Sequence, residues 1–341
     1  MERSCQGKTH LTFHTITNEE QKMKLSNLMI AVVAILATLA ANCPAETIPY
    51  ADSKIVPPTD EWVAKVEAAA PAKPTVCPGD REPLKVLVFS LRTGYNHLVM
   101  PHVDRTVEVL GKKSGLFKAD VTVDIDRLAP DALAKYDILV LNNNCSKGPR
   151  RNLLLDELES NAKYSDMTET DRAARAAELE RSILDFVEGG KGLVAIHGAP
   201  TMINNSEAFT AMVGAAFHYH PPNQAVTVNT VDADHPLVAA FKGKGSFIHR
   251  DEPYCFNGTY ERLDFRPLLK METEGMKGYR TDSNIPRYVS WIRPHGKGRV
   301  FYLSPSHFPA SYESTTMLQF MLDGFQYVAG DLKCDDSTPE K

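Results

Sequence analysis

The stretch GLVAIHGAP, residues 192–200, is the part of the sequence that decides the fold. Its apolar residues 194–196 form a short run with glycines at 189, 190 and 192 upstream, a pattern typical of a buried strand. In open α/β sheets, ligands bind at the carboxyl ends of such strands. The stretch therefore predicts an α/β sheet and places the imidazole of His197 at the edge where chemistry is expected.

Apolar runs of strand length alternate with helix-like segments upstream of this stretch. The sequence predicts strands at 86–91, 121–125 and 136–144, a helix at 101–110 and a charged, helical segment at 151–188. Strands that alternate with helices indicate parallel βαβ units around one central sheet.

Downstream of residue 220 the pattern changes. Residues 224–231 alternate as a half-buried strand does, and residues 287–307 predict two strands joined by a turn. Residues 312–329 predict a closing helix with an apolar face. We assign the core domain to residues 84–330 and a polar tail to residues 331–341.

The amino terminus has the pattern of a signal peptide. Met23 and Lys24 precede an apolar run at 28–41 that ends in small residues, which predicts cleavage after Ala41 or Ala45. We therefore interpret Met23 as the true start of translation, with residues 1–22 an extension that does not belong to the protein. Residues 23–45 are then a signal peptide, which predicts an exported protein, periplasmic or secreted. No membrane association beyond this peptide is predicted, because the run is shorter than the ~20 residues of a span. A lipid anchor on Cys43 is the alternative.

Residues 46–83 are rich in proline and alanine, which predicts an extended arm with one short helix at about 59–70. The whole chain of 341 residues carries a formal charge of −5 without a sustained basic run. Nucleic acid is therefore not an expected partner.

The cysteines exclude one class of metal site and leave disulfide pairing open. Cys77, Cys145, Cys255 and Cys334 belong to the predicted mature chain and lack the CxxC spacing of a zinc ribbon. An exported protein can form one or two disulfides from them. Cys145 follows a predicted strand, where it is either a thiol nucleophile or a buried or disulfide-linked cysteine. We favour the buried or disulfide-linked cysteine.

Several histidines end predicted strands, which places them at one edge of the sheet. His97 follows the first strand, His197 ends the strand at 193–197, and His307 follows the last strand. His220 lies in the segment AFHYHPP, and His102 falls in the first helix, where we expect a surface or capping residue. Imidazole exchanges protons near neutral pH, so His97, His197, His220 and His307 are candidate catalytic residues.

The segment HRDEPY, residues 249–254, supplies two adjacent carboxylates. On an extended segment Asp251 and Glu252 point to opposite sides, so only one can enter a given pocket. We expect Glu252 in the pocket and Asp251 bracing a histidine or arginine, and we count both among the candidate catalytic residues.

Six segments, in order, resemble the signature segments of ThuA-like (trehalose-utilisation) proteins. They are VLVFSLRTGYNH (86–97), GLVAIHGAP (192–200), FHYHPPNQAVTV (217–228), DADHPL (232–237), DEPYCF (251–256) and VSWIRPHGKGRVFYLSPSHF (289–308). The resemblance implies a flavodoxin-like fold similar to class I glutamine amidotransferases, a mostly parallel sheet with helices on both faces. Those amidotransferases carry a cysteine in a Gly-x-Cys-x-Gly turn after the equivalent strand. Here His197 occupies that place, and an imidazole cannot form the thioester of glutamine-dependent transfer.

The resemblance also implies carbohydrate catabolism, in particular the handling of 3-keto-glycosides made by partner sugar oxidoreductases. We expect acid/base chemistry on such a small carbohydrate: elimination, isomerisation or hydrolysis. Glu252 or His197 would be the base and His97 or His307 the acid. The alternative is a non-catalytic carbohydrate-binding or scaffolding protein of the same fold.

Substrate binding and metal binding follow from the same reading. Six residues are candidate sugar contacts, amides for the hydroxyls and aromatic rings for the sugar face: Asn142, Asn143, Asn144, Tyr95, Tyr219 and Trp291. A divalent metal such as zinc, held by some subset of the histidines and the glutamate, could polarise the ketone. Because tight ligand spacing such as HExxH is missing, the sequence leaves the metal open.

Overall fold

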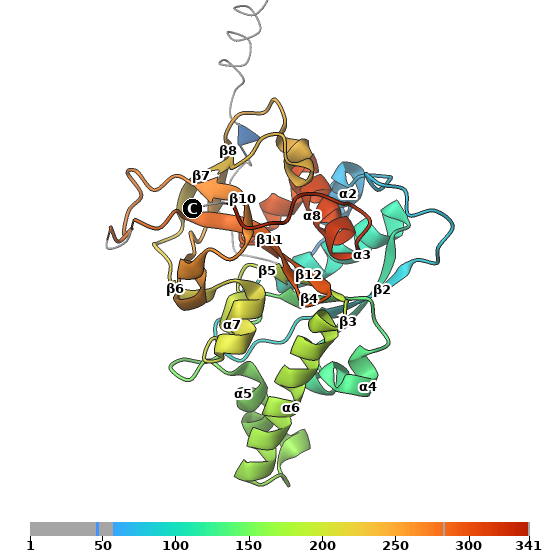
Figure 1. The fold of residues 1–341 in the computed structure, drawn as a ribbon, viewed down its shortest axis with the longest axis vertical. Coiled ribbons are helices and arrows are strands. Elements are labelled where there is room, and N and C mark those ends of the chain that lie inside the picture. Colours follow the sequence, from blue (N-terminus) through green and yellow to red (C-terminus); the bar gives the residue numbers. More distant parts are fainter. Residues whose placement is uncertain (1–45, 48–56, 282–283, 340–341) are drawn as a thin grey trace, which may run out of the picture. The chain divides into compact units, whose positions relative to one another are not determined.

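A ten-stranded sheet runs through the part of the chain that the computed structural model describes, residues 46–47, 57–281 and 284–339 (Figure 1). In spatial order its strands are β1 (Glu46–Thr47), β8 (Phe247–Asp251), β7 (Gln224–Thr230), β10 (Arg266–Met271), β11 (Tyr288–His295), β12 (Gly298–Leu303), β5 (Gly192–Ile196), β4 (Ile138–Asn142), β2 (Leu84–Phe89) and β3 (Phe117–Thr122). A separate two-stranded sheet pairs β6 (Ala216–Tyr219) with β9 (Cys255–Asn257). The predicted extension at 1–22 and signal peptide at 23–45 lie outside the described residues.

The large sheet has a parallel half and an antiparallel half. Strands β12, β5, β4, β2 and β3 pair in parallel, as the alternation of strands and helices predicts. Strands β12, β11, β10, β7 and β8 pair antiparallel, which is where the sequence pattern changes after residue 220. The predicted pair of strands at 287–307 is β11 and β12.

Strand direction brings distant loops to one edge of the sheet. Four successive antiparallel pairings separate β12 from β8, so both strands run in the same direction. The carboxyl ends of β2, β4, β5, β12 and β8 therefore share one edge, where the loops carrying the candidate histidines and Glu252 begin.

Helices cover both faces of the sheet, which confirms the predicted fold class (Figure 1). In β2, Val86 and Val88 face one core while Leu87 and Phe89 face the other, as expected for a strand buried on both sides. The first face carries α2 (Asp60–Ala69), α3 (Met100–Ser114) and α8 (Thr315–Val328). The second carries α4 (Pro130–Leu133), α5 (Leu153–Ser160), α6 (Glu169–Glu188) and α7 (Glu207–Val213).

The proline- and alanine-rich arm contacts the first face. Its helix α2 begins after Thr59, whose hydroxyl accepts a hydrogen bond from the backbone N–H of Trp62. The Trp62 side chain is buried. Farther along, the Thr75 hydroxyl donates to Asp323 of α8, and the backbone of Val76 bonds to the Gln326 side chain. Residues 48–56 of the arm lie outside the described part.

Two local predictions are wrong in position. The strand expected at 121–125 is β3 at Phe117–Thr122. It is an edge strand whose buried side chain is Phe117, whereas Val123 is exposed and Asp124 caps a 3₁₀ turn. His102, expected at the helix surface, is buried and meets the Trp62 ring edge-on at 4.6 Å. The apolar partner comes from the arm, which a helix pattern read alone does not include.

Two further features concern the residues that the structure describes. Cys77, Cys145 and Cys334 are free thiols. Within the described residues, no helix combines the length and apolarity that spanning a membrane requires.

Candidate functional site

Four buried side chains, which we call the His3Glu cluster, meet at the carboxyl edge of the sheet: His97, His197, Glu252 and His307. One donor atom from each lies within 4.8 Å of the other three. Oε2 of Glu252 lies 3.6 Å from Nε2 of His97, 3.5 Å from Nε2 of His197 and 3.2 Å from Nδ1 of His307. The structure thus brings together four of the six residues predicted as catalytic.

His197 follows β5 in a left-handed backbone conformation, with φ of 45°. The carbonyl of Ser304 lies 2.9 Å from its Nδ1, and the Tyr302 hydroxyl donates to its backbone carbonyl. Because a carbonyl only accepts hydrogen bonds, Nδ1 carries the proton. In the neutral ring, Nε2 therefore faces Glu252 with a free lone pair.

His97 lies in the loop after β2, which is fastened to the loop after β4. The backbone N–H groups of Thr93 and Gly94 donate to the Cys145 carbonyl, and a Cβ on Gly94 would clash with the Ser146 carbonyl. A Cβ on Gly198 would lie only 2.9 Å from Cys145 Sγ and 3.0 Å from His97 Cε1. These two glycines let three loops approach closely enough to seat His97.

Asp251 holds Glu252 and His307 in place without entering the His3Glu cluster. Its carboxylate accepts backbone N–H bonds from Glu252 at 2.9 Å, Ser306 at 3.1 Å and His307 at 3.3 Å. His249 Nε2 lies 2.8 Å from the same carboxylate. The catalytic assignment of Asp251 is therefore corrected to a positioning role, because both of its oxygens are engaged by backbone groups.

Burial and mutual contact shift the pKa values of the cluster. Burial would raise the pKa of Glu252, but its interactions with His197, His307 and His97 hold that pKa well below its usual range. Burial lowers the pKa of His97 to about 3, against the opposing effect of Glu252. Burial raises the pKa of the neighbouring Cys145 to about 11, so this residue stays a thiol and is a poor nucleophile at neutral pH.

Two tyrosines frame the cluster. Tyr254 is buried; its ring centroid lies 4.3 Å from that of His197 and its hydroxyl 3.4 Å from His97 Nε2. Tyr95 is 58 % exposed, and its ring lies 4.8 Å from His97 and 6.4 Å from His307. Tyr95, a predicted sugar contact, is thus an accessible aromatic surface beside the cluster. Tyr254 was missed, although its position two residues after Glu252 is a signal for a shared side.

The remaining predicted catalytic residue, His220, lies one ring away from the cluster. It is exposed, and its ring stacks on that of Tyr254, with the two ring centroids 5.7 Å apart. Its Nδ1 lies 2.9 Å from the Pro221 carbonyl. The structure therefore places His220 outside the His3Glu cluster. Its predicted catalytic role stays a prediction.

The three asparagines are corrected from sugar contacts to loop fasteners. The Asn142 amide donates to the Ser90 hydroxyl and the Met100 carbonyl, and the Asn144 amide donates to the Phe89 and Leu91 carbonyls. The Asn143 amide donates to the side chain of Asn142. All three asparagines are fully buried, so their amides hold the turns after β2 and β4 together.

One aromatic sugar contact is corrected. Trp291 is fully buried, stacks on Tyr302 at 4.2 Å and donates its indole N–H to the Val213 carbonyl, so its ring belongs to the core. Tyr219 is half-buried: the Arg280 guanidinium lies 4.1 Å from its ring centroid, and its hydroxyl accepts the Arg280 backbone N–H. Its role as a sugar contact stays a prediction.

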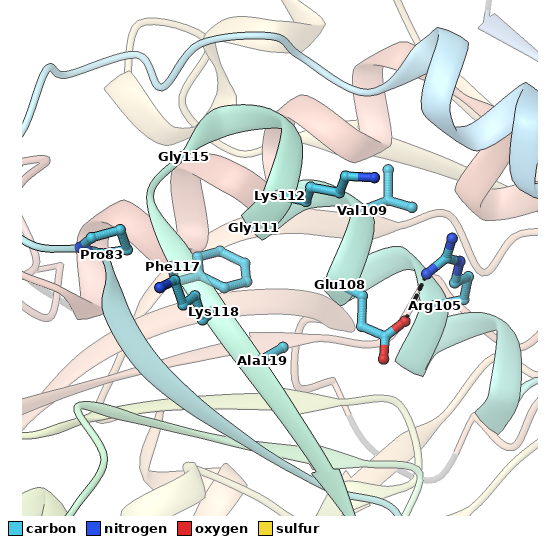
Figure 2. Close-up of a pocket in the computed structure, with 10 residues that line it drawn as sticks. All are labelled: Pro83, Arg105, Glu108, Val109, Gly111, Lys112, Gly115, Phe117, Lys118 and Ala119. Carbon is cyan, nitrogen blue, oxygen red and sulfur yellow. Dashed lines mark hydrogen bonds and ion pairs between the residues drawn. The ribbon is translucent and has the colours of Figure 1, made fainter.

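The surface also has a cavity of about 530 Å³ at the opposite end of the strands (Figure 2). It lies between the end of α3 and the start of β3, lined by Gly111, Lys112 and Phe117, with the Arg105–Glu108 ion pair at its side. Ligands of open α/β sheets bind at the carboxyl ends of strands. The His3Glu cluster, and not this cavity, is therefore the candidate active site.

Comparison with known proteins identifies relatives over most of the chain. The ThuA family, described as trehalose utilisation, matches residues 85–328. A ThuA-like protein from Bacteroides uniformis is 19% identical, with a TM-score of 0.52, covering 74% of this chain and 95% of its own. A ThuA-like protein from Parabacteroides merdae is 16% identical, with a TM-score of 0.49 and coverages of 76% and 94%. A glutamine amidotransferase from Thermotoga maritima is 11% identical, with a TM-score of 0.38 and coverages of 73% and 99%. No curated protein matches the sequence.

Proposed function

Because the chain belongs to the ThuA family, described as trehalose utilisation, we propose that it is a carbohydrate-catabolism enzyme whose His3Glu cluster carries out proton transfer on a 3-keto-glycoside. The observation that carries this proposal is the convergence of three imidazoles on one oxygen of Glu252. The accessible ring of Tyr95 lies directly beside them and offers a stacking surface for a sugar face.

A ketone at C3 of a sugar acidifies the hydrogen on C2, and the cluster has the groups to use that acidity. The Glu252 carboxylate takes the C2 proton, and the electron pair left on C2 forms the C1–C2 double bond. The C1–oxygen bond breaks, and an imidazolium of the cluster returns one proton to the departing alcohol. Atoms and charge balance: one proton leaves carbon, and one reaches the leaving oxygen.

The same groups also support isomerisation. If the proton removed from C2 is returned to C3 while a hydroxyl proton moves between the oxygens, the ketone migrates from C3 to C2 and no bond to C1 breaks. Hydrolysis differs from both in requiring a water molecule. The substrate scan described below separates the three reactions by their products.

Glutamine-dependent amide transfer is not the proposed activity. The position after β5 carries His197, which cannot form a thioester. The nearby thiol of Cys145 is buried, 3.4 Å from the His97 ring, and its raised pKa keeps it protonated. We further propose that the protein acts after export, on glycosides that sugar oxidoreductases have oxidised.

The experiment is a substrate scan with purified protein. Trehalose and simple glycosides, each with its 3-keto derivative, are incubated with wild type and with E252Q, and the products are identified by mass spectrometry and NMR. The proposal expects turnover of keto-glycosides alone and its loss in E252Q. Binding of keto-glycosides by both proteins without turnover would instead establish the non-catalytic carbohydrate-binding alternative.

A further inference from the structure

We propose that the His3Glu cluster is the binding site of one divalent transition-metal ion, with zinc the best match. The inference goes beyond the proposed reaction, because it concerns what the four side chains bind whatever sugar is turned over. Three imidazole nitrogens and one carboxylate oxygen form a donor set of the kind that proteins use for zinc.

Four of the six spacings between the donor atoms fit a single ion. Zinc binds histidine nitrogen at about 2.0–2.1 Å in tetrahedral geometry, which places neighbouring donors about 3.3–3.4 Å apart. Glu252 Oε2 lies 3.6, 3.5 and 3.2 Å from the nitrogens of His97, His197 and His307. His197 Nε2 and His307 Nδ1 are 3.1 Å apart. Four of the six edges of the tetrahedron thus fall within about 0.3 Å of the expected length.

Groups behind the ligands fix their orientation, as in established metal sites. The Nδ1–H of His197 donates to the Ser304 carbonyl, so the nitrogen without a proton faces the other donors. Nδ1 of His97 faces Cys145 Sγ at 3.4 Å, which turns its Nε2 toward Glu252. Asp251 fastens the backbones of Glu252 and His307. Each of the four ligands is therefore held by a neighbour outside the cluster or by its own loop.

Charge balance favours a cation at this place. Glu252 is only 6 % exposed, and its buried negative charge faces imidazoles that are neutral in their ordinary metal-binding form. A divalent cation supplies the missing positive charge and satisfies the lone pairs that point to one centre.

The arrangement leaves part of Glu252 available for chemistry. All three histidine contacts run to Oε2, so Oε2 is the ligand atom and Oε1 remains outside the donor set. A bound cation would act as a Lewis acid toward a ketone oxygen taken up as a fifth ligand, which strengthens the acidity of the neighbouring C–H. Because the three imidazoles would then be ligands, the proton for the departing alcohol would come from the Glu252 carboxyl that took it from C2.

The test measures metal binding without an activity assay. Purified full-length protein is stripped with a chelator, dialysed and titrated with Zn²⁺ in competition with a chromophoric chelator. Elemental analysis then gives the stoichiometry. We expect one zinc per chain, a melting temperature several degrees higher with zinc than without, and visible absorption bands of a tetrahedral or five-coordinate site when Co²⁺ replaces zinc.

Two variants locate the ion. H197Q should weaken zinc binding by at least about 100-fold, since it removes a direct ligand and outer groups alone are worth 10–100-fold. H218Q alters an exposed histidine outside the cluster and should bind zinc as wild type does. Failure of wild type to bind stoichiometric metal, or equal affinity in wild type and H197Q, would overturn the proposal. The wild-type titration decides the matter even if H197Q does not fold, and a metal-free protein that still turns over keto-glycosides would refute the metal while leaving the reaction standing.

Discussion

Nδ1 of His307 lies 3.1 Å from Nε2 of His197, although 110 residues separate the two in the chain. The contact follows from topology: His197 is the first residue after β5, and His307 lies four residues past the end of β12, which pairs with β5 in parallel. Parallel neighbours end at the same edge of a sheet, so side chains in their following loops meet.

Backbone strain at His197 predicts an unusual ranking of variants. With φ of 45°, any residue with a Cβ is disfavoured there by about 1–2 kcal/mol, and glycine is not. H197G should therefore be more stable than H197A by about 1 kcal/mol, although it loses more side chain. Chemical denaturation of the two variants measures the difference. A less stable H197G would mean that the backbone of this turn is relaxed.

Gly198 is expected to tolerate no side chain while Cys145 keeps its sulfur. In G198A the new Cβ meets Cys145 Sγ and the His97 ring, and such overpacking costs about 1–3 kcal/mol. Removing the sulfur in C145A makes room, so the double variant should recover part of the loss. A double-mutant cycle of unfolding free energies measures this coupling. Strict additivity would show that the two side chains do not compete for the same space.

His102 should make the fold sensitive to acid. Burial lowers its pKa to about 4, whereas the unfolded chain binds the proton near pH 6.5. Between these two values the unfolded state holds more protons, so stability falls as the pH drops from about 6.5 to about 4. H102F keeps an aromatic ring against Trp62 but has no group that titrates. Its free energy of unfolding should therefore fall by roughly 1–2 kcal/mol less than that of wild type over this pH range. Denaturation midpoints at pH 7 and pH 4.5 test this; equal losses in both proteins would exclude His102 as the source.

The predicted signal peptide lies outside the described residues and has its own test. Protein recovered from its native host should begin near Asn42 or Glu46, because the apolar run ends in small residues there. Intact-mass and amino-terminal peptide analysis of the periplasmic or secreted fraction reads this directly. An unprocessed chain found in the cytoplasm would contradict export.

The sequence predicts the position of those site residues that directly follow a parallel strand. The strand at 193–197 and the end of the last strand place His197 and His307, because a parallel sheet has only one carboxyl edge. Glu252 comes to that edge by a longer route. β8 runs in the same direction as β12 because four antiparallel pairings lie between them. The sequence does not specify the order of these strands in the sheet.

Side chains predicted as sugar contacts failed for a different reason. Asn142 and Asn144 lie at the end of β4, as expected, but their amide N–H groups donate to the backbone carbonyls of Phe89, Leu91 and Met100, around the loop after β2. Trp291 lies in a strand covered on both sides, so its ring belongs to the core. Residue type and strand position do not distinguish a ligand contact from an internal fastener; only the packing of the adjacent loops does.

The central claim is that Glu252 transfers a proton on a keto-sugar, and the most direct measurement is the kcat of wild type, E252Q and E272Q on a 3-keto-glycoside. E252Q keeps the shape of the side chain but removes its basicity, so kcat should fall by about 10²–10⁴-fold. E272Q changes an exposed glutamate bonded to Asn229, away from the cluster, and should match wild type. Wild-type turnover in a folded E252Q protein would contradict the account.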